Sequence, residues 1–446
     1  MSMRLWLAPV LMFAFGVAAR AASTPGDLGK SLTSFGGIVA GNAAGTIPAW
    51  SGGITTPPAG FTRGGPHPDP FAGENKRFSI TAGNMTQYAA HLTPGVQAML
   101  RQYPEYRLDV YPTHRSFAAP QAIYDAAITN ARTAHLAPDG NAVLDARVSI
   151  PFPIPHNGLE AVWDHLLRWR GYQAHFTSFA ASPTAGGDYT LIKNETWLLF
   201  PYSLGGDTAP GAALAYYKIK TLAPPLFAGQ IAVAVDHVDP GAHPRTAWIY
   251  NPGEQRVRRA PTVNFDTPIL QADSLMTDDD LDLFNGSPER FDWKLVGRHE
   301  FYVPYNDYDF GSPSHDYAEI LKPHVVNPNL MRWELHRVWV VDATLKPGSG
   351  HIYARRTFYF DEDSFEGLLA DEYDRRGLIW RVAQGAPIEY YELPMLTNSA
   401  NIFYDLPSGR YHARGLRNRG TMLEFFGPRL SAADFTPEAL RQEGVR

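Results

Sequence analysis

A regular alternation of apolar and polar residues, which begins near residue 187, constrains the fold more than any other feature of the chain. A period of two is the pattern of a β-strand with one buried face. In the stretch 330–342, one face is apolar except at Arg337. Its apolar side chains are those of Met331, Trp333, Leu335, Trp339 and Val341. This stretch predicts a long strand against a core.

Further stretches with the same period predict a sheet of many strands. They cover residues 189–200, 212–222, 229–238, 245–250, 291–303 and 353–360. The segments between strands carry Pro-Gly or Asp-rich sequences typical of antiparallel hairpins, at 239–242, 251–254, 346–350, 361–363 and 374–377. A sheet of this size must curl or close, because a long open edge invites aggregation. The 22 tyrosines, 24 phenylalanines and 10 tryptophans predict that one of its faces is rich in aromatic residues.

An irregular segment and several helices precede the strands. Residues 22–77 show little periodicity but contain apolar residues that predict a strap lying against a core: Ile47, Trp50, Ile54 and Phe61. Short helices are expected over 84–102, broken at Pro94, and over 120–135.

The clearest helix follows Asn157, which can cap it together with Glu160. Its apolar residues share one face at helical spacing, and Gly171 ends the region. A second, acidic segment over 272–284 predicts a short helix between strands.

The first 21 residues have the layout of a secretory signal. Arg4 precedes an apolar run, and Ala19-Arg20-Ala21 supplies a small-x-small cleavage triplet. The alternative, a membrane anchor, needs roughly 20 apolar residues, and about 15 are present here. We therefore expect an exported, periplasmic protein that is not lipidated, since the chain has no cysteine. The formal net charge of -6 argues against nucleic acid as a partner.

The expected fold is mainly β with α, a large curved antiparallel sheet (an incomplete β-barrel) covered by helices and the N-terminal strap. Three regions are expected. Residues 1–21 form the signal peptide, residues 22–170 the strap and helices, and residues 171–446 the half-barrel with a C-terminal tail, the last two as one structural unit.

Three long motifs resemble one protein family. They are the stretches 108–116 (LDVYPTHRS), 150–165 (IPFPIPHNGLEAVWDH) and 246–261 (TAWIYNPGEQRVRRAP). They are similar to those of a proteobacterial domain-of-unknown-function family, number 1329, over nearly the whole chain. The third motif also resembles the strand-turn-strand of periplasmic lipoprotein carriers of the outer-membrane lipoprotein-sorting type. That resemblance implies an incomplete barrel around an apolar cavity and, by analogy, an apolar ligand. Fold alone does not fix function, and the family supplies no catalytic residues.

Four strand tryptophans and one arginine are the candidate ligand-binding residues. Trp197, Trp248, Trp333 and Trp339 could line a cavity, because ligand sites are concave and mostly apolar. Ordinary core packing is the alternative for each of them. Arg337 could bind a phosphate or carboxylate of a lipid. The alternative is an ion pair with an internal acid, such as Glu195 or Glu300, which would offset its burial.

Two other groups of charged residues have weaker claims. Arg256, Arg258 and Arg259 form a basic rim that could be plain surface or could meet an anionic partner. His114 and Arg115 are expected to be hydrogen-bonding residues rather than catalysts.

No motif indicates a metal, a cofactor or a known catalytic site. There is no His-Glu-x-x-His, paired-cysteine, phosphate-loop, dinucleotide or Gly-x-Ser-x-Gly sequence. The acidic runs at 278–280 and 361–363 lack the pattern of a calcium loop and are expected to be a helix start and a hairpin tip. The presence of a pair of catalytic carboxylates stays an open question, because the distance between two such groups in space cannot be read from the sequence.

Three functions are consistent with these features. The first is a periplasmic carrier for a lipid or other apolar molecule, with the helix around Trp163 and the strap covering the mouth. The second is a non-catalytic partner of an envelope membrane protein, such as an exporter. The third is a hydrolase that uses unrecognised carboxylates. The carrier is the leading hypothesis.

Overall fold

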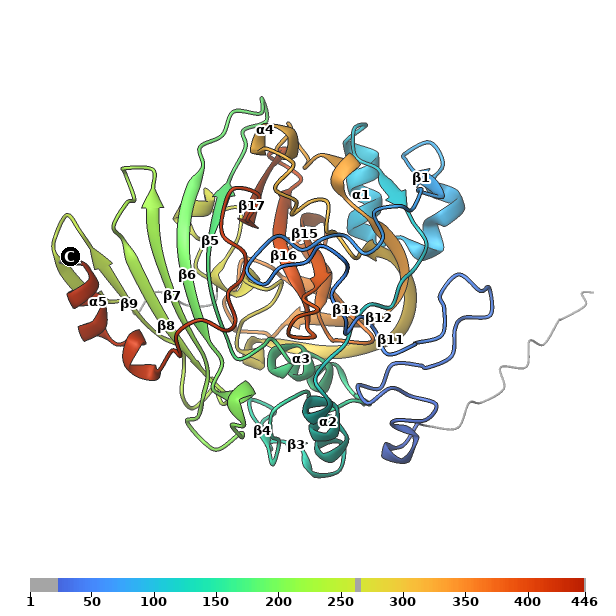
Figure 1. Ribbon diagram of the computed structural model, residues 1–446, viewed down its shortest axis with the longest axis horizontal. Coiled ribbons are helices and arrows are strands. Elements are labelled where there is room, and N and C mark those ends of the chain that lie inside the picture. The colour runs from blue at the N-terminus through green and yellow to red at the C-terminus, as the bar shows by residue number, and fades with distance from the viewer. Residues whose placement is uncertain (1–22, 261–265, 445–446) are drawn as a thin grey trace, which may run out of the picture.

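The computed structural model describes residues 23–260 and 266–444. The expected signal peptide, residues 1–21, lies outside the described residues. The chain builds one sheet of fifteen strands that is not closed, plus a two-stranded ribbon (Figure 1). The strand order is β1-β2-β12-β13-β14-β15-β16-β17-β5-β6-β7-β8-β9-β10, and β11 also pairs with β12. All described pairings are antiparallel except that of β2 with β12.

The strands and helices have the following bounds. The strands are β1 Phe78–Ile80, β2 Leu108–Val110, β3 His135–Leu136, β4 Val143–Leu144, β5 Gln173–Ala181, β6 Ile192–Leu199, β7 Ala213–Ala223, β8 Ile231–His237, β9 Thr246–Asn251, β10 Arg256–Arg259, β11 Phe291–Pro304, β12 Trp333–Leu345, β13 Arg355–Asp361, β14 Gly367–Tyr373, β15 Ile379–Glu389, β16 Leu396–Asp405 and β17 Arg410–Leu416. The helices are α1 Pro94–Gln102, α2 Gln121–Thr133, α3 Gly158–Leu167, α4 Tyr317–Ile320 and α5 Pro437–Gly444.

The expected mainly β fold with a large curved sheet is confirmed. The seven strands predicted from periodicity are β6–β9 and β11–β13, each within a few residues of its expected ends. The break at Pro94 separates α1 from the 3-10 helix η2, Met85–His91. Helix α3 is capped by Asn157, whose side chain accepts a hydrogen bond from the Glu160 amide.

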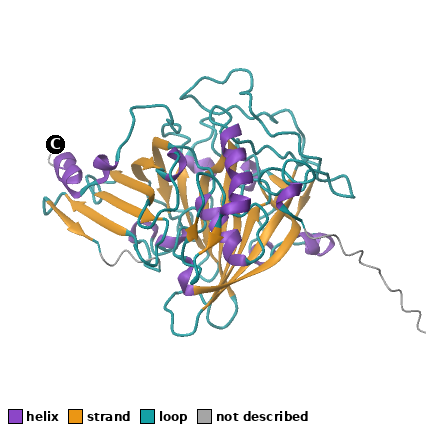
Figure 2. Ribbon diagram, turned by 90° about the horizontal axis from the view of Figure 1, so that it is seen from below, coloured by secondary structure: helices purple, strands orange, loops and turns teal. Residues whose placement is uncertain are grey.

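One end of the sheet curls on itself. Strand β11 pairs with β12 yet also contacts β14 and β15 across the fold. The rings of Phe301 on β11 and Tyr359 on β13 lie 5.3 Å apart inside this curl. The other end, strands β5–β10, extends away from the curl, and we call it the wing (left in Figure 1). In the view from below, the strands fan out behind the helices (Figure 2).

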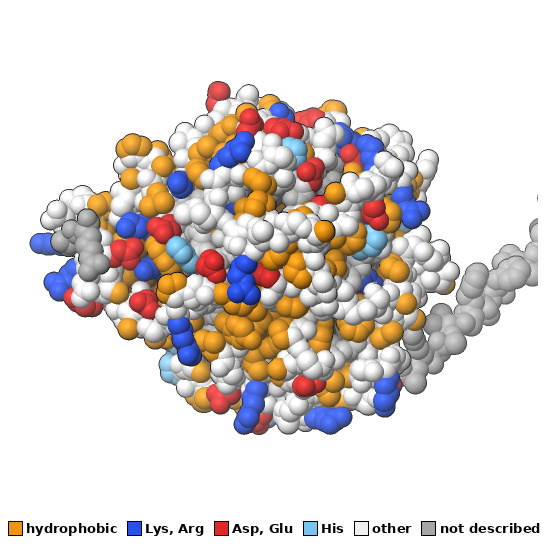
Figure 3. Space-filling model, in the orientation of Figure 1, with side chains coloured by type: hydrophobic (Ala, Val, Ile, Leu, Met, Phe, Trp, Pro, Cys, Tyr) orange, Lys and Arg blue, Asp and Glu red, His pale blue; other side chains and the backbone are white. Residues whose placement is uncertain are grey.

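Different helices cover the two faces of the sheet. On one face, which we call the α1 face, the Gly95 amide at the start of α1 donates to Asp371 of β14. On the opposite α3 face, the His165 ring of α3 stacks on Phe360 of β13 at 4.6 Å. Hydrophobic side chains also gather at the surface over α3 (Figure 3). The strap is ordered, with Phe35 and Ile47 buried in the main core.

Candidate functional site

Side chains of the chain itself fill the curled end of the sheet. Tyr305 stacks on His336 at 3.8 Å between their ring centroids, and its hydroxyl donates to Asp361. The Glu389 side chain is fully buried in the same region. A hollow nearby, lined in part by His67 and Tyr390, has a volume of about 30 Å³, roughly the room of one water. A lipid chain does not fit such a space.

Among the predicted ligand residues, Trp333, Trp339 and Arg337 of β12 are buried core residues. The guanidinium of Arg337 pairs with Glu362 at 2.7 Å and donates to the strap carbonyl of Ala40 at 2.7 Å. An internal ion pair of Arg337 was the alternative expected from the sequence. The structure has such a pair, with Glu362 as the partner instead of Glu195 or Glu300. Glu362 lies at the tip of the next hairpin, a closeness that cannot be read from strand periodicity.

Trp197 and Trp248 lie on the α1 face of the wing, far from Trp333 and Trp339 in the strand order. They pack on a separate small core with Phe435 and Leu440 of the C-terminal segment. Lys218 lies over the Trp197 ring at 4.2 Å and pairs with Glu443 of α5 at 2.9 Å. The structure thus does not bring the four tryptophans together around one space.

The C-terminal segment covers the α1 face of the wing at β8 and β9, whereas side chains on the α3 face of the same strands are exposed. Strand β8 reads Ile-Ala-Val-Ala-Val over 231–235 and is apolar on both faces. Ile231 and Val233 are buried beneath the C-terminal segment, whereas Ala232 between them is exposed. Directly beside Ala232 on β9, Ile249 is 38% exposed. Strands that are apolar on both faces are normally buried on both. We call the apolar side chains of this face the open strip: Ile219, Ala232, Ala234 and Ile249.

Residues 266–285, which we call the crossing segment, lie over the α3 face and contact both the wing and the strands nearer the curled end. At one end the side chain of Gln271 donates to Thr221 of β7 and to Gln230. At the other end the Asn285 amide donates to the Tyr217 hydroxyl of β7 at 3.5 Å. Leu270 of this segment is 81% exposed. The crossing segment thus borders the open strip and adds an exposed apolar side chain to its edge.

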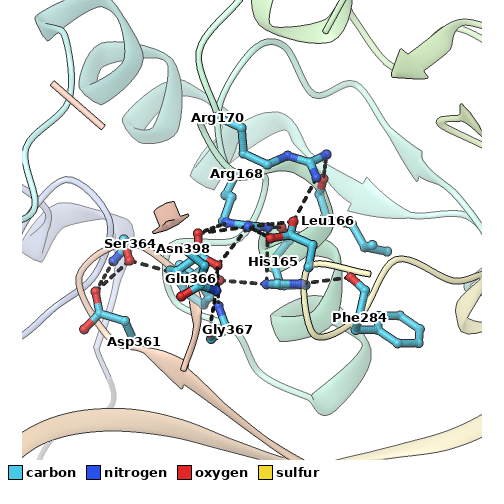
Figure 4. Close-up of polar contacts among 12 residues, drawn as sticks. His165, Leu166, Arg168, Arg170, Phe284, Asp361, Ser364, Glu366, Gly367 and Asn398 are labelled. Atoms are coloured by element: carbon cyan, nitrogen blue, oxygen red, sulfur yellow. Dashed lines mark hydrogen bonds and ion pairs between the residues drawn. The ribbon is translucent and has the colours of Figure 1, made fainter. Parts of the chain in front are cut away.

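An ion-pair cluster fixes the crossing segment to α3 and β14 (Figure 4). Arg168, just after α3, pairs with Glu366 at 2.9 Å and with Asp282 of the crossing segment at 2.7 Å. Arg170 pairs with the same Asp282 at 3.0 Å. These two arginines outweigh burial and lower the pKa of Asp282 to about 2, whereas burial raises the pKa of Glu366 to about 7. The neutral ring of His165 completes the cluster, since burial lowers its pKa to about 3.

A second cluster fixes the crossing segment to β13. Arg356 pairs with Asp279 at 2.9 Å and with Asp280 at 2.6 Å, and all three side chains are buried. Thr277 caps the 3-10 helix that carries these acids, so the acidic run at 278–280 is a helix start, as expected. Its function is structural, as an anchor for the segment.

The family model for DUF1329, described as a protein of unknown function, matches residues 79–441. The chain belongs to the DUF1329 family. An uncharacterised protein of Pseudomonas aeruginosa is 43% identical over 433 residues, which span 96% of this chain and 95% of the relative. The motif-based recognition of the family is therefore confirmed.

Solved structures with partial similarity include one of the same family. A DUF1329 protein from Desulfovibrio piger matches with a TM-score of 0.43 and 16% identity, over 63% of this chain and 95% of that one. A putative outer membrane lipoprotein-sorting protein domain from Vibrio parahaemolyticus matches with a TM-score of 0.45 and 15% identity, over 64% and 98%. A LolA superfamily protein from Nitrosomonas europaea gives a TM-score of 0.37 and 11% identity, over 62% and 94%.

Within the described part of this DUF1329 chain, no group of three or more His, Cys, Asp or Glu side chains is placed to hold a metal ion. Every helix described there is too short or too polar to cross a bilayer. The other residues considered from sequence take structural positions. His114 bonds Glu74 of the strap at 2.7 Å, and Arg115 pairs with Asp363 of the hairpin tip.

Sequence reasoning missed the open strip and the residues that border it. The alternation in β7–β9 was recognised, but periodicity does not say which of two apolar faces a distant segment covers. An available signal was the run Ile-Ala-Val-Ala-Val, which is apolar on both faces and therefore calls for a cover on each.

Proposed function

We propose that this protein is a periplasmic carrier that binds an apolar or amphiphilic molecule, such as a lipid, on the open strip of the wing. The observation that carries the proposal is the exposed apolar face of β8 and β9, at Ala232 and Ile249, in a strand that is apolar on both sides. Contiguous exposed apolar surface marks a binding site more often than it marks ordinary surface.

The surroundings of the strip support this proposal. The β7–β8 connection presents Leu226, which is 78% exposed, and the crossing segment presents Leu270. Gln271, next to Leu270, bonds to Gln230 in that connection, which brings the two exposed leucines to the same end of the wing. Each CH₂ group of a ligand that leaves water on such a surface contributes roughly 0.8 kcal/mol.

The expected signal sequence supports a periplasmic location for this activity. There, a carrier would need to take up a lipid from one membrane and release it at another. An open strip suits such exchange better than a sealed cavity, because a ligand can enter it without unfolding of the filled interior.

The test is binding of a fluorescent long-chain fatty acid to the purified protein. Ile249→Asp and Ala232→Asp place a charge on the strip at exposed positions, where folding tolerates it. The matched control is Leu378→Asp, at a residue that is 56% exposed in the β14–β15 turn. We expect the two strip variants to lose most of the binding and the control to retain it.

Two results would overturn the proposal. One is a protein that binds neither the probe nor lipids extractable from the periplasm. The other is probe binding that both strip variants leave unchanged. Recovery of an envelope protein that binds wild type but not Ile249→Asp, without any lipid, would assign the strip to a protein partner instead.

A further inference from the structure

Arg414 of β17 has no charged or hydrogen-bonding partner among the described residues, although its side chain lies on the α3 face beneath the crossing segment. Its strand neighbours on this face confirm the orientation. Arg410 pairs with Asp273 of the crossing segment at 2.5 Å, and His412 lies between the two arginines at alternate positions.

Arg414 is partly exposed, and it differs from the buried arginines on this face because each of those has a carboxylate in contact. Arg168 has Glu366, Arg356 has Asp279 and Asp280, and Arg381 has Asp405. Burial without such a contact lowers the pKa of Arg414 to about 10, and the charges of Asp278 and Asp282 only partly oppose this effect. A desolvated cation that lacks a partner is costly in a native protein.

Other polar groups around Arg414 also lack partners. Asn401 lies directly opposite Arg414 on β16, and its side-chain nitrogen is buried without an acceptor. Asp278 of the crossing segment interacts with Arg414 electrostatically, but the two groups form no ion pair within 4 Å among the described contacts. Buried polar groups are almost always hydrogen-bonded, so the unpaired Asn401 nitrogen beside Arg414 indicates a missing acceptor.

The α3 face is less polar at the open strip than at Arg414. The register aligns Ser178 of β5 with Asn194 of β6, and in the next row it aligns Phe176 of β5 with Thr196 of β6 and Thr196 with Ile219 of β7. From Ile219 the same face continues through Ala232 to Ile249. Along these rows the face is thus charged at β17, mixed polar and apolar at β5 and β6, and apolar from Ile219 of β7 to β9. Five strand spacings of about 4.8 Å separate β17 from β9, roughly 24 Å in all.

We infer that Arg414, together with Asn401, binds the oxyanion of an amphiphile whose hydrocarbon part lies on the open strip. The oxyanion is a carboxylate or a phosphate, since a guanidinium presents paired donors that match either group. This inference rests on the proposed function and adds to it the chemical class of the ligand: a single-chain anionic lipid. The ligand would lie across the strands, with its charged end toward β17.

The test compares a long-chain fatty acid with its methyl ester of the same chain length, using wild type, Arg414→Met and Arg414→Lys. We expect wild type to bind the acid about tenfold or more tightly than the ester, because a hydrogen bond to a charged group contributes that much. Arg414→Met should lower the affinity for the acid to that for the ester and leave the ester unchanged. Arg414→Lys should retain part of the preference.

The control is Arg258→Met on β10. Arg258 lies opposite Ile249 at the other end of the strip and is paired with Glu254 at the surface. The Arg258→Met variant should keep the preference for the acid over the ester. A lysophosphatidic acid with the same chain distinguishes phosphate from carboxylate, and inorganic phosphate shows whether the headgroup binds without a tail.

Folding does not confound this test. Arg414 makes no ion pair that its replacement would break, so the melting temperature of Arg414→Met should equal or exceed that of wild type. Equal affinity of wild type for acid and ester would overturn the inference and leave the proposed function intact. The inference would also be overturned if Arg414→Met kept the preference for the acid over the ester, or if Arg258→Met removed that preference to the same extent. Failure of both ligands to bind would instead contradict the proposed function itself.

Discussion

Arg168 and Glu366 form an ion pair with an Nη2–Oε2 distance of 2.9 Å, and their side chains are 1% and 0% exposed. The pair links the end of α3 to the start of β14, and Asp282 extends it to the crossing segment. Removal of one partner leaves an uncompensated charge in the interior. The position of the segment that borders the open strip therefore depends on this pair.

Substitution of Arg168 by alanine should destabilise the fold strongly. The free energy of unfolding should fall by about 3–5 kcal/mol, since Glu366 and Asp282 lose their common partner. Urea unfolding followed by circular dichroism measures the change. Arg441→Ala, which breaks an exposed pair with Glu438, is the control and should cost at most about 1 kcal/mol. If both variants lose the same free energy of unfolding, the buried pair contributes no more to stability than an exposed one.

Substitution of Arg337 by methionine should loosen the strap. Arg337 donates to the strap carbonyls of Ile38 and Ala40 and neutralises the buried Glu362. Hydrogen exchange of residues 38–50 should become faster, whereas exchange in β7–β9 should stay as in wild type. Lipid binding should also be unaffected, in contrast to the sequence-based hypothesis that Arg337 holds a ligand. Loss of lipid binding without faster exchange in the strap would restore that hypothesis.

Substitution of Phe435 by alanine should detach the C-terminal segment from the wing. Phe435 is buried, and its ring lies 5.3 Å from that of Tyr216. A buried Phe→Ala change costs about 3–5 kcal/mol, more than a short segment can be expected to withstand. Trp197 and Trp248, now partly buried, would then become more exposed to water, so the tryptophan emission should shift to longer wavelength. Unchanged emission would mean that α5 holds the segment in place without Phe435.

The sequence was enough to predict the class of fold, and the reasons are local. Alternation in β12, the cap at Asn157 and the hairpin turns are all short-range signals, and each was realised. Strands β5 and β14–β17 were not predicted from periodicity; β5 carries a run of small and polar residues without clean alternation. The site could not be predicted because it depends on long-range pairing. The path of the crossing segment decides which arginines find a partner. It brings Asp279 to Arg356, 77 residues away in the sequence, but brings no carboxylate into contact with Arg414.

The stability of the protein should fall with decreasing pH, in part through His412. This side chain lies on β17 between Arg410 and Arg414, and its Nδ1 is 2.9 Å from the Ser182 hydroxyl. Burial, with a smaller contribution from the charge of Arg414, lowers its pKa to about 3 from the usual 6.5. Between pH 6.5 and 3 the unfolded chain therefore binds a proton that the folded chain does not. Linkage then lowers the free energy of unfolding by up to about 1.4 kcal/mol for each pH unit of acidification in that window.

The variant His412→Asn isolates this contribution. It keeps a polar group near Ser182 but cannot take up the proton, so the slope of unfolding free energy against pH should fall by up to one proton between pH 6 and 4. Ser182→Ala is the matched control, because it removes the same hydrogen bond but leaves the histidine. It should lower stability at pH 7 and keep most of the wild-type slope. If His412→Asn retains the full slope, His412 takes up its proton over the same pH range in the folded and the unfolded chain, and the expected contribution of its burial is wrong.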